Sequence, residues 1–143
     1  FFFVARRILL RHLHFMPMSV RFLVTVTNAG LSSVNAVYYQ QSATVIPQGF
    51  AAVCEQQRWN VQKTWDKLNA GRDWWYAENG SYIYANAMDG KWWIDEPNGG
   101  GVYIAPAHTG TPPSEGWQPL MKNVLPLPNV NVEAEAVSRG AQH

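Results

Sequence analysis

Two pairs of adjacent tryptophans, Trp74-Trp75 and Trp92-Trp93, constrain the fold of this chain more than any other feature. A tyrosine-rich segment separates the pairs, with an Asn-Gly turn before it and an Asp-Gly turn after it. These dipeptides, between aromatic and β-branched runs, are the strongest local signals for β-hairpins. The sequence therefore predicts a three-stranded meander. Its strands are residues 73–77, 82–86 and 92–95.

Each tryptophan pair is expected to place one ring on each face of the sheet, because neighbouring residues of a strand project to opposite sides. One face then packs in the core, and the other carries an aromatic strip. We expect the chain itself to cover this strip, through a helix containing Trp65 or through the N-terminal segment. An open ligand-binding or partner-binding face is the alternative. The candidate binding residues are Trp75, Trp92, Tyr82, Tyr84 and Trp117.

Alternating β-branched and aromatic residues predict further strands on both sides of the meander. In residues 20–27, for example, Phe22, Val24 and Val26 fall on one face. The other predicted strands are residues 34–40, 50–54 and 102–105. The predicted fold class is therefore mainly β: a single antiparallel β-sheet, sandwich or partly open barrel of about six to eight strands.

One segment changes from the strand period to the helix period. Val61, Trp65 and Leu68 recur at the spacing of one helix face. Asn60 is a candidate N-cap and Gly71 a candidate stop. We therefore predict one short helix, residues 57–70, inserted between the two halves of the sheet.

The two ends of the chain differ in composition from its middle. Residues 1–19 form a basic and aromatic N-terminal segment, for which three interpretations are open: a mitochondrial-type targeting segment, sequence upstream of the true start, or an integral or partner-docked part of the fold. Residues 20–120 are predicted to form the β domain. The prolines after residue 106 are expected to prevent regular sheet or helix, and residues 121–143 are predicted to be a Pro-rich tail with a frayed helical turn at 133–138.

Charge and cysteine content limit the classes of function. Eleven Lys and Arg against ten Asp and Glu leave a net charge of +1, too small for the phosphate-neutralising field of a nucleic-acid binder. The apolar runs are too short for a membrane span. Cys54 is the single cysteine, which excludes an internal disulfide and suits a reducing compartment. We expect a cytoplasmic location, with a mitochondrial one as the alternative.

Candidate catalytic and metal-binding residues are scattered, and we expect no enzyme, no metal and no cofactor. Cys54 lies in an apolar run and is expected to be a buried small hydrophobe rather than a nucleophile. His12 and His14 would share one strand face, but two ligands without a third make a weak metal site. The carboxylates fall mostly at strand ends or turns, where acids are usually solvated. They are Asp73, Glu78, Asp89, Asp95 and Glu96.

A series of short aromatic motifs resembles a small Trp- and Tyr-rich β-domain family found in eukaryotic, often protist, proteins. That family reads V-N-G-x-Y, a middle G-x-P-x-Y strand, a Tyr hairpin, W-x-I, an isolated Tyr, and P-P-x-x-x-W. The matching positions lie within about residues 20–120: residues 34–38, 82–84 and 93–94, Tyr103, and residues 112–113 with 116–117.

The chain also departs from the family pattern. Ala36 replaces the motif glycine, residues 48–53 match the middle strand loosely, and residues 57–72 look like an insertion. The resemblance implies a fold and a modular habit, since such domains accompany kinase and ubiquitin-related regions. It implies no activity and no catalytic residues.

The expected function is a non-enzymatic protein-interaction or scaffold module that binds another protein through the aromatic face and the proline-rich tail. A homodimer through the N-terminal segment or the aromatic face is an alternative partner arrangement. A small-ligand or carbohydrate-binding domain, with the ligand stacked on Trp75, Trp92 and Tyr82, is the second class. An enzyme of unrecognised type is the third, and a buried His or carboxylate beside Cys54 in a cleft would favour it.

Overall fold

The structure, a computed structural model, describes residues 18–138 of the chain. It divides into two compact units. The smaller contains residues 18–21 and 134–138 of the described part, and in it the Ser19 hydroxyl donates a hydrogen bond to the Val137 carbonyl oxygen over 3.2 Å. The larger unit is Phe22–Glu133. Residues 1–17, with His12 and His14, lie outside the described residues, so the interpretations of the N-terminal segment stay predictions.

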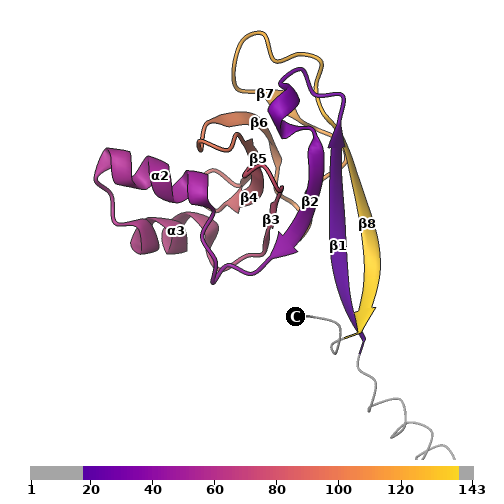
Figure 1. The fold of residues 1–143 in the computed structure, drawn as a ribbon, viewed down its shortest axis with the longest axis horizontal. Coiled ribbons are helices and arrows are strands. Elements are labelled where there is room, and N and C mark those ends of the chain that lie inside the picture. Colours follow the sequence, from indigo (N-terminus) through magenta and orange to yellow (C-terminus); the bar gives the residue numbers. More distant parts are fainter. Residues whose placement is uncertain (1–17, 139–143) are drawn as a thin grey trace, which may run out of the picture. The chain divides into compact units, whose positions relative to one another are not determined.

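Eight strands of the described residues form one curled antiparallel sheet (Figure 1). Their order is β7-β6-β5-β4-β3-β2-β1-β8. This confirms the predicted mainly β class and the single antiparallel sheet. The strands are β1 (Met18–Thr27), β2 (Ala36–Gln41), β3 (Trp74–Tyr76), β4 (Tyr82–Asn86), β5 (Lys91–Asp95), β6 (Gly101–Pro106), β7 (Gln118–Pro119) and β8 (Asn129–Ser138), with a 3-10 helix, η1 (Ser32–Val34), before β2.

The predicted meander is present as β3, β4 and β5. Strand β4 pairs with β3 on one side and with β5 on the other, and β6 continues the sheet beyond β5. In the connecting turns Gly80 and Gly90 have φ angles of 97° and 68°, in the left-handed region that glycine adopts most easily. The two hairpin signals therefore predicted both the strands and their order.

The tryptophan pairs are split between the two faces of the sheet, as predicted. Trp75 and Trp92 are fully buried in the main core, with ring centroids 5.7 Å apart. Trp74 and Trp93 belong to a second apolar cluster. Because the strands place adjacent residues on opposite sides, this second cluster lies on the other face.

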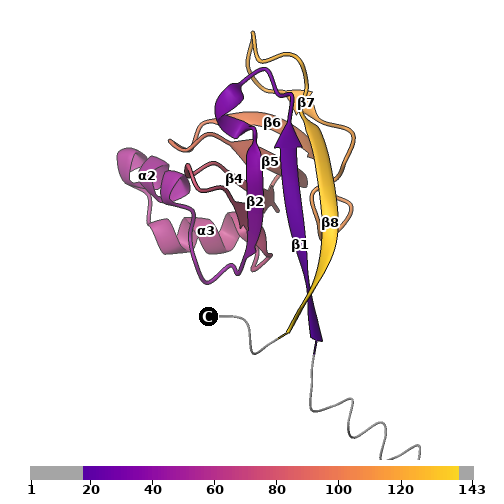
Figure 2. The same cartoon turned by 45° about the vertical axis from the view of Figure 1, so that its right-hand side comes forward.

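Two helices cover part of this second face, α2 (Gln48–Gln57) and α3 (Val61–Asn69) (Figures 1 and 2). Trp65 of α3 is 1% exposed, and its ring centroid lies 6.0 Å from that of Trp74 and 5.9 Å from that of Tyr84. Phe50 of α2 packs edge-on against Trp65 at 5.0 Å. The chain thus covers much of the aromatic strip through the predicted helix that contains Trp65.

The predicted N-cap of that helix is confirmed, whereas the helix itself is shorter than expected. The Asn60 side-chain oxygen accepts a hydrogen bond from the Lys63 backbone N–H over 2.9 Å. The helix ends at Asn69, and Ala70 and Gly71 follow it with φ angles of 53° and 75°. These left-handed residues end α3 one residue before the predicted limit.

Residues 50–54 lie in α2, so the strand predicted there is wrong and there are two α-helices between β2 and β3 rather than one. A short apolar run fits either a buried strand or one face of a helix. Phe50 and Cys54 are both buried in the second cluster. Their spacing of four residues is that of a helix face, and Pro47 directly precedes the first helical residue.

Regular structure also follows the prolines, contrary to the prediction. Strand β8 begins directly after Pro128 and includes residues 133–138, where a frayed helical turn was predicted. No proline interrupts the ten residues of this strand, so none of its backbone donors is removed. Val130 and Val132 alternate with the exposed Asn131 and Glu133, as expected for a strand with one packed side.

A close backbone contact seats α2 against the loop between β5 and β6. A Cβ at Gly49 would lie 2.5 Å from the Pro97 carbonyl oxygen and 2.8 Å from the Gly99 nitrogen. Because these are backbone atoms, Gly49→Ala is expected to lower the free energy of unfolding by about 1–3 kcal/mol in a urea titration. Gly110→Ala is the control, since nothing lies within 4 Å of its Cβ position. Equal stability of the two variants would contradict this contact.

Candidate functional site

All five residues predicted to bind a ligand or partner are buried. Trp75, Trp92 and Trp117 lie in the main core, and Tyr82 and Tyr84 lie beneath the helices in the second cluster. The structure therefore divides them between two clusters on opposite faces of the sheet. In the described structure these side chains form core, and a binding role for them stays a prediction.

One part of the second face is left open by the helices, along β2 and β3. Tyr39 is 40% exposed and Tyr76 is 38% exposed, and their ring centroids lie 5.7 Å apart. Val37 precedes Tyr39 by two residues on the same face and is also exposed. Val37, Tyr39 and Tyr76 are named the open aromatic surface below.

Strand alternation and register position this surface. Tyr38 points into the main core, where its hydroxyl donates a hydrogen bond to the Val34 carbonyl oxygen over 2.6 Å. Its neighbour Tyr39 therefore projects to the other face. Antiparallel pairing sets Tyr39 directly opposite Tyr76. Two cross-strand aromatic rings thus lie together in solvent, at a position where the helices do not reach.

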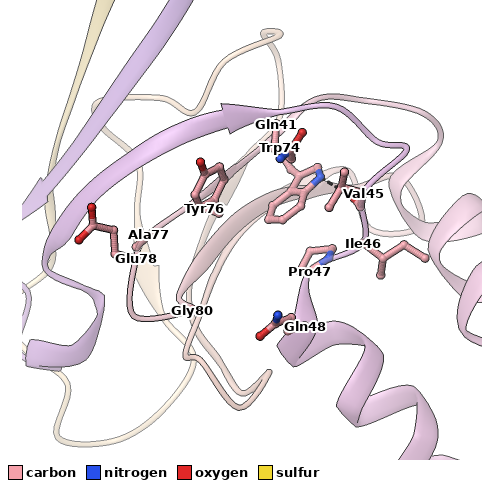
Figure 3. Close-up of a pocket in the computed structure, with 10 residues that line it drawn as sticks. All are labelled: Gln41, Val45, Ile46, Pro47, Gln48, Trp74, Tyr76, Ala77, Glu78 and Gly80. Atoms are coloured by element: carbon pink, nitrogen blue, oxygen red, sulfur yellow. Dashed lines mark hydrogen bonds between the residues drawn. The ribbon is translucent and has the colours of Figure 1, made fainter. Parts of the chain in front are cut away.

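A hollow of about 290 Å³ adjoins the open aromatic surface, between β3 and the segment that leads into α2 (Figure 3). Trp74 and Tyr76 line it together, as Figure 3 shows. The Trp74 indole N–H donates to the carbonyl oxygens of Ser42 and Val45, over 3.0 and 2.9 Å, and these bonds fix the ring in place. This hollow is named the Trp74 pocket.

A second hollow, of about 360 Å³, is lined by Val37 and Tyr39. Glu78 lines both this hollow and the Trp74 pocket. Among the described residues that line the two hollows, Glu78 is the only charged one. The site therefore combines apolar and aromatic surface with a single negative charge.

Asp95 is a candidate functional residue, and its burial was not predicted from the sequence. Acids at strand ends are usually solvated, but Asp95 is 4% exposed, so that expectation is wrong here. Burial raises the pKa of Asp95 to about 7, Glu96 adds to the rise, and the Tyr82 hydroxyl opposes it. The signal was the alternation in β5: Trp92 faces the core, so Asp95, three residues later, faces the helices.

Cys54 is buried in α2, as predicted, and it lines the same cavity as Asp95. Burial raises the pKa of the Cys54 thiol, although the Thr64 hydroxyl opposes the rise. The reactive form of cysteine is the thiolate, so a raised pKa leaves Cys54 a poor nucleophile at neutral pH. A buried carboxylate beside Cys54 in a cleft was the observation that would favour an enzyme. Asp95 lines the same cavity as Cys54, and the expectation about enzymatic activity stays a prediction.

Two further classes of site were sought in the part of the chain that the structure describes. No three His, Cys, Asp or Glu side chains there come together as a metal site requires. None of the helices within residues 18–138 is long and apolar enough to span a membrane.

Comparisons of the chain with protein-family models, with curated proteins and with solved structures found no match. The resemblance to the Trp- and Tyr-rich β-domain family therefore stays a prediction, as do the expected absences of metal, cofactor and enzymatic activity. The geometry of the open aromatic surface and its two hollows is the basis for a functional proposal.

Proposed function

We propose that this chain is a non-enzymatic protein-interaction module that binds an extended segment of a partner protein on the open aromatic surface. The observation that carries the proposal is the exposed pair Tyr39 and Tyr76, side by side and next to two hollows. Tyrosine is enriched in protein interfaces and among the residues that dominate binding energy, because it offers a large rigid ring and a polar tip.

The arrangement of the hollows favours an extended segment as the ligand. Tyr76 lines the Trp74 pocket, and Tyr39 lines the second hollow. Alternate side chains of an extended peptide project to the same side about 6–7 Å apart. The tyrosine rings are separated by a similar 5.7 Å. Alternate side chains of one peptide would therefore fit the two adjoining hollows. Pockets for alternate side chains are how binding grooves select extended peptides.

The lining residues also indicate the chemistry of the partner segment. Val37 and the two tyrosines offer apolar area, which favours proline and other apolar side chains. Glu78 supplies one negative charge, and no Lys or Arg of the described residues lines either hollow. We therefore expect an apolar segment with one Lys or Arg, which pairs with Glu78 at the edge of the tyrosines.

A selection from a random peptide library, followed by calorimetry with one selected synthetic peptide, tests the proposal. The selected sequences are expected to combine apolar residues with one basic residue. Tyr39→Ser and Tyr76→Ser are each expected to weaken binding at least about tenfold, because each removes an anchoring ring. Trp59→Ser is the matched control, since Trp59 is an exposed aromatic residue that lines neither hollow.

Two results would count against the proposal. One is a selection that yields no binding peptide. The other is a peptide whose affinity is the same for the wild-type chain and for both tyrosine variants, because it would then bind elsewhere.

A carbohydrate is the second candidate ligand. Gln41, Gln48 and Glu78 line the Trp74 pocket with Tyr76 and would hydrogen-bond to sugar hydroxyls. The Trp74 ring is buried and its N–H is already paired, so a sugar would stack on Tyr76. Oligosaccharide binding that is lost in Tyr76→Ser and Gln48→Ala, but kept in Tyr39→Ser, would favour this class over the peptide.

A further inference from the structure

A separate cavity of about 140 Å³ lies between the two helices and strands β4 and β5. It shares no lining residue with the Trp74 pocket. Asp95 is the only charged residue among the described residues that line it. We name it the Asp95 cavity. Its aromatic lining residues are Phe50, Trp59, Tyr82, Tyr84 and Trp93.

Two buried polar atoms of this lining, Tyr82 Oη and Asp95 Oδ1, have no hydrogen-bond partner within the described residues. The Tyr82 hydroxyl is close enough to the carboxyl to lower its pKa, but the two groups do not meet with hydrogen-bond geometry. Buried polar groups are nearly always paired in folded proteins. The Tyr82 hydroxyl has one proton to offer the carboxylate, which leaves lone pairs on both oxygens for a further group that donates hydrogen bonds.

We propose that the Asp95 cavity binds a small alkylammonium group that carries N–H donors. The carboxylate supplies the opposite charge and one acceptor, and the Tyr82 oxygen supplies a second acceptor. The aromatic rings around them attract a cation through their faces. A purely apolar ligand would leave both oxygens unpaired, and an anion would be repelled by Asp95.

The size of the cavity and the number of acceptors narrow the ligand further. A volume of about 140 Å³ holds roughly four or five heavy atoms, at about 30 Å³ for each. The n-propylammonium ion and the end of a lysine side chain are of this size. An alkylguanidinium carries five N–H donors, far more than the two oxygens can accept, whereas an alkylammonium carries three.

Access to the cavity does not require the core to open. Trp59 follows α2, lines the cavity and is 53% exposed. Gly99 and Gly101, from the loop and the start of β6, also line it and are half-buried. A ligand therefore reaches the cavity from the side of Trp59 and the glycine loop.

The charge of Asp95 makes the proposed binding depend on pH. Burial raises its pKa to about 7, so the fraction of carboxylate grows through neutral pH. Burial also raises the pKa of each tyrosine near Asp95, so these hydroxyls stay neutral. The charge of Glu96 adds to the rise in the pKa of Asp95. An ammonium ligand is therefore expected to bind more tightly as the pH rises. The titratable groups around Asp95 are Tyr38 on β2, Tyr82 and Tyr84 on β4, Cys54 on α2, and Glu96.

Titration of the full chain with n-propylammonium chloride, followed by ¹H–¹⁵N NMR, tests this inference. 1-Propanol is the neutral control with the same number of heavy atoms. The ammonium ion is expected to shift the amide signals of Tyr82 and Asp95, with a dissociation constant at least about tenfold lower at about pH 8 than at about pH 5.5. 1-Propanol is expected to show no such dependence on pH.

Two variants locate the binding. Asp95→Asn is expected to weaken propylammonium binding at least about tenfold and to leave 1-propanol unaffected, because only the charge is removed. Glu96→Gln is the control, since Glu96 does not line the cavity. Tyr82→Phe, which removes the second acceptor, serves as an independent variant should Asp95→Asn fail to fold.

Several outcomes would overturn the inference. The first is that propylammonium does not bind at about 100 mM. The second is that 1-propanol or guanidinium binds as tightly as propylammonium, or that the affinity for propylammonium does not change with pH. The third is that Glu96→Gln weakens propylammonium binding as much as Asp95→Asn does. None of these outcomes bears on the peptide proposal, because Tyr39 and Tyr76 do not line the Asp95 cavity.

Discussion

Trp65→Ala is expected to lower the free energy of unfolding by about 3–5 kcal/mol, which is a large share of the total free energy of unfolding of a small domain. Trp65 is 1% exposed, and its indole N–H donates to the Ala43 carbonyl oxygen over 2.8 Å. The ring also joins Phe50 of α2 to Trp74 of the sheet. Alanine would remove these contacts, leave a cavity under α3, and leave the Ala43 oxygen without its donor. Guanidinium titration followed by circular dichroism measures the loss.

Trp59→Ala is the matched control, because Trp59 is the same residue type in the same helical layer but is 53% exposed. Its substitution is expected to lower the free energy of unfolding by less than about 1 kcal/mol, because substitutions at exposed positions usually have small effects on stability. Similar losses in the two variants would show that Trp65 does not hold the helices on the sheet as the contacts indicate.

Local signals in the sequence predicted the meander and the division of its side chains. Gly80 and Gly90 mark turns because few other residues adopt their positive φ angles easily. Between the turns, the period of two residues decides which tryptophan of each pair enters the core. Both signals involve residues that are close together in the chain, so they need no knowledge of tertiary contacts.

The α2 helix was missed because its local signal is ambiguous. Residues 50–54 are apolar, and a run of that length fits a buried strand as well as a helix. Contacts that are distant in sequence also hold this segment in place: Gly49 packs against the backbone of Pro97 and Gly99, in the loop after β5. A contact between segments so far apart leaves no periodic pattern in either of them.

The position of the candidate site depends on the same distant packing. The sequence predicted an aromatic second face, but not which part of it the helices leave open. Tyr84 is buried under α2 and α3, whereas Tyr39 and Tyr76 lie beyond their reach and are exposed. In the same way, Asp95 becomes buried because helices cover its face of β5. Sequence alternation assigns each residue to a face, and only the helix positions decide its exposure.

Asp95→Asn is expected to stabilise the protein at neutral and alkaline pH much more than in acid. In the unfolded chain the carboxyl has its ordinary pKa of 3.8, and burial in the fold raises this to about 7. Between these values the folded state keeps a proton that the unfolded state has lost. Folding therefore becomes less favourable as the pH rises from about 4 to about 7, and the effect is constant above that. At 1.36 kcal/mol per pH unit, the whole effect is roughly 4 kcal/mol.

Urea titrations of the wild-type chain and of Asp95→Asn over about pH 4 to 8 measure this effect as a difference, so that the other titrating groups cancel. The free energy of unfolding of the variant, relative to that of the wild type, is expected to rise by roughly 4 kcal/mol as the pH increases across that range, because asparagine has no charge to bury. Glu115→Gln, which removes an exposed carboxylate, is the control. A flat curve for Asp95→Asn would mean that the carboxylate is solvated or paired in the folded protein, and the Asp95 cavity would then offer no unpaired acceptor to a cation.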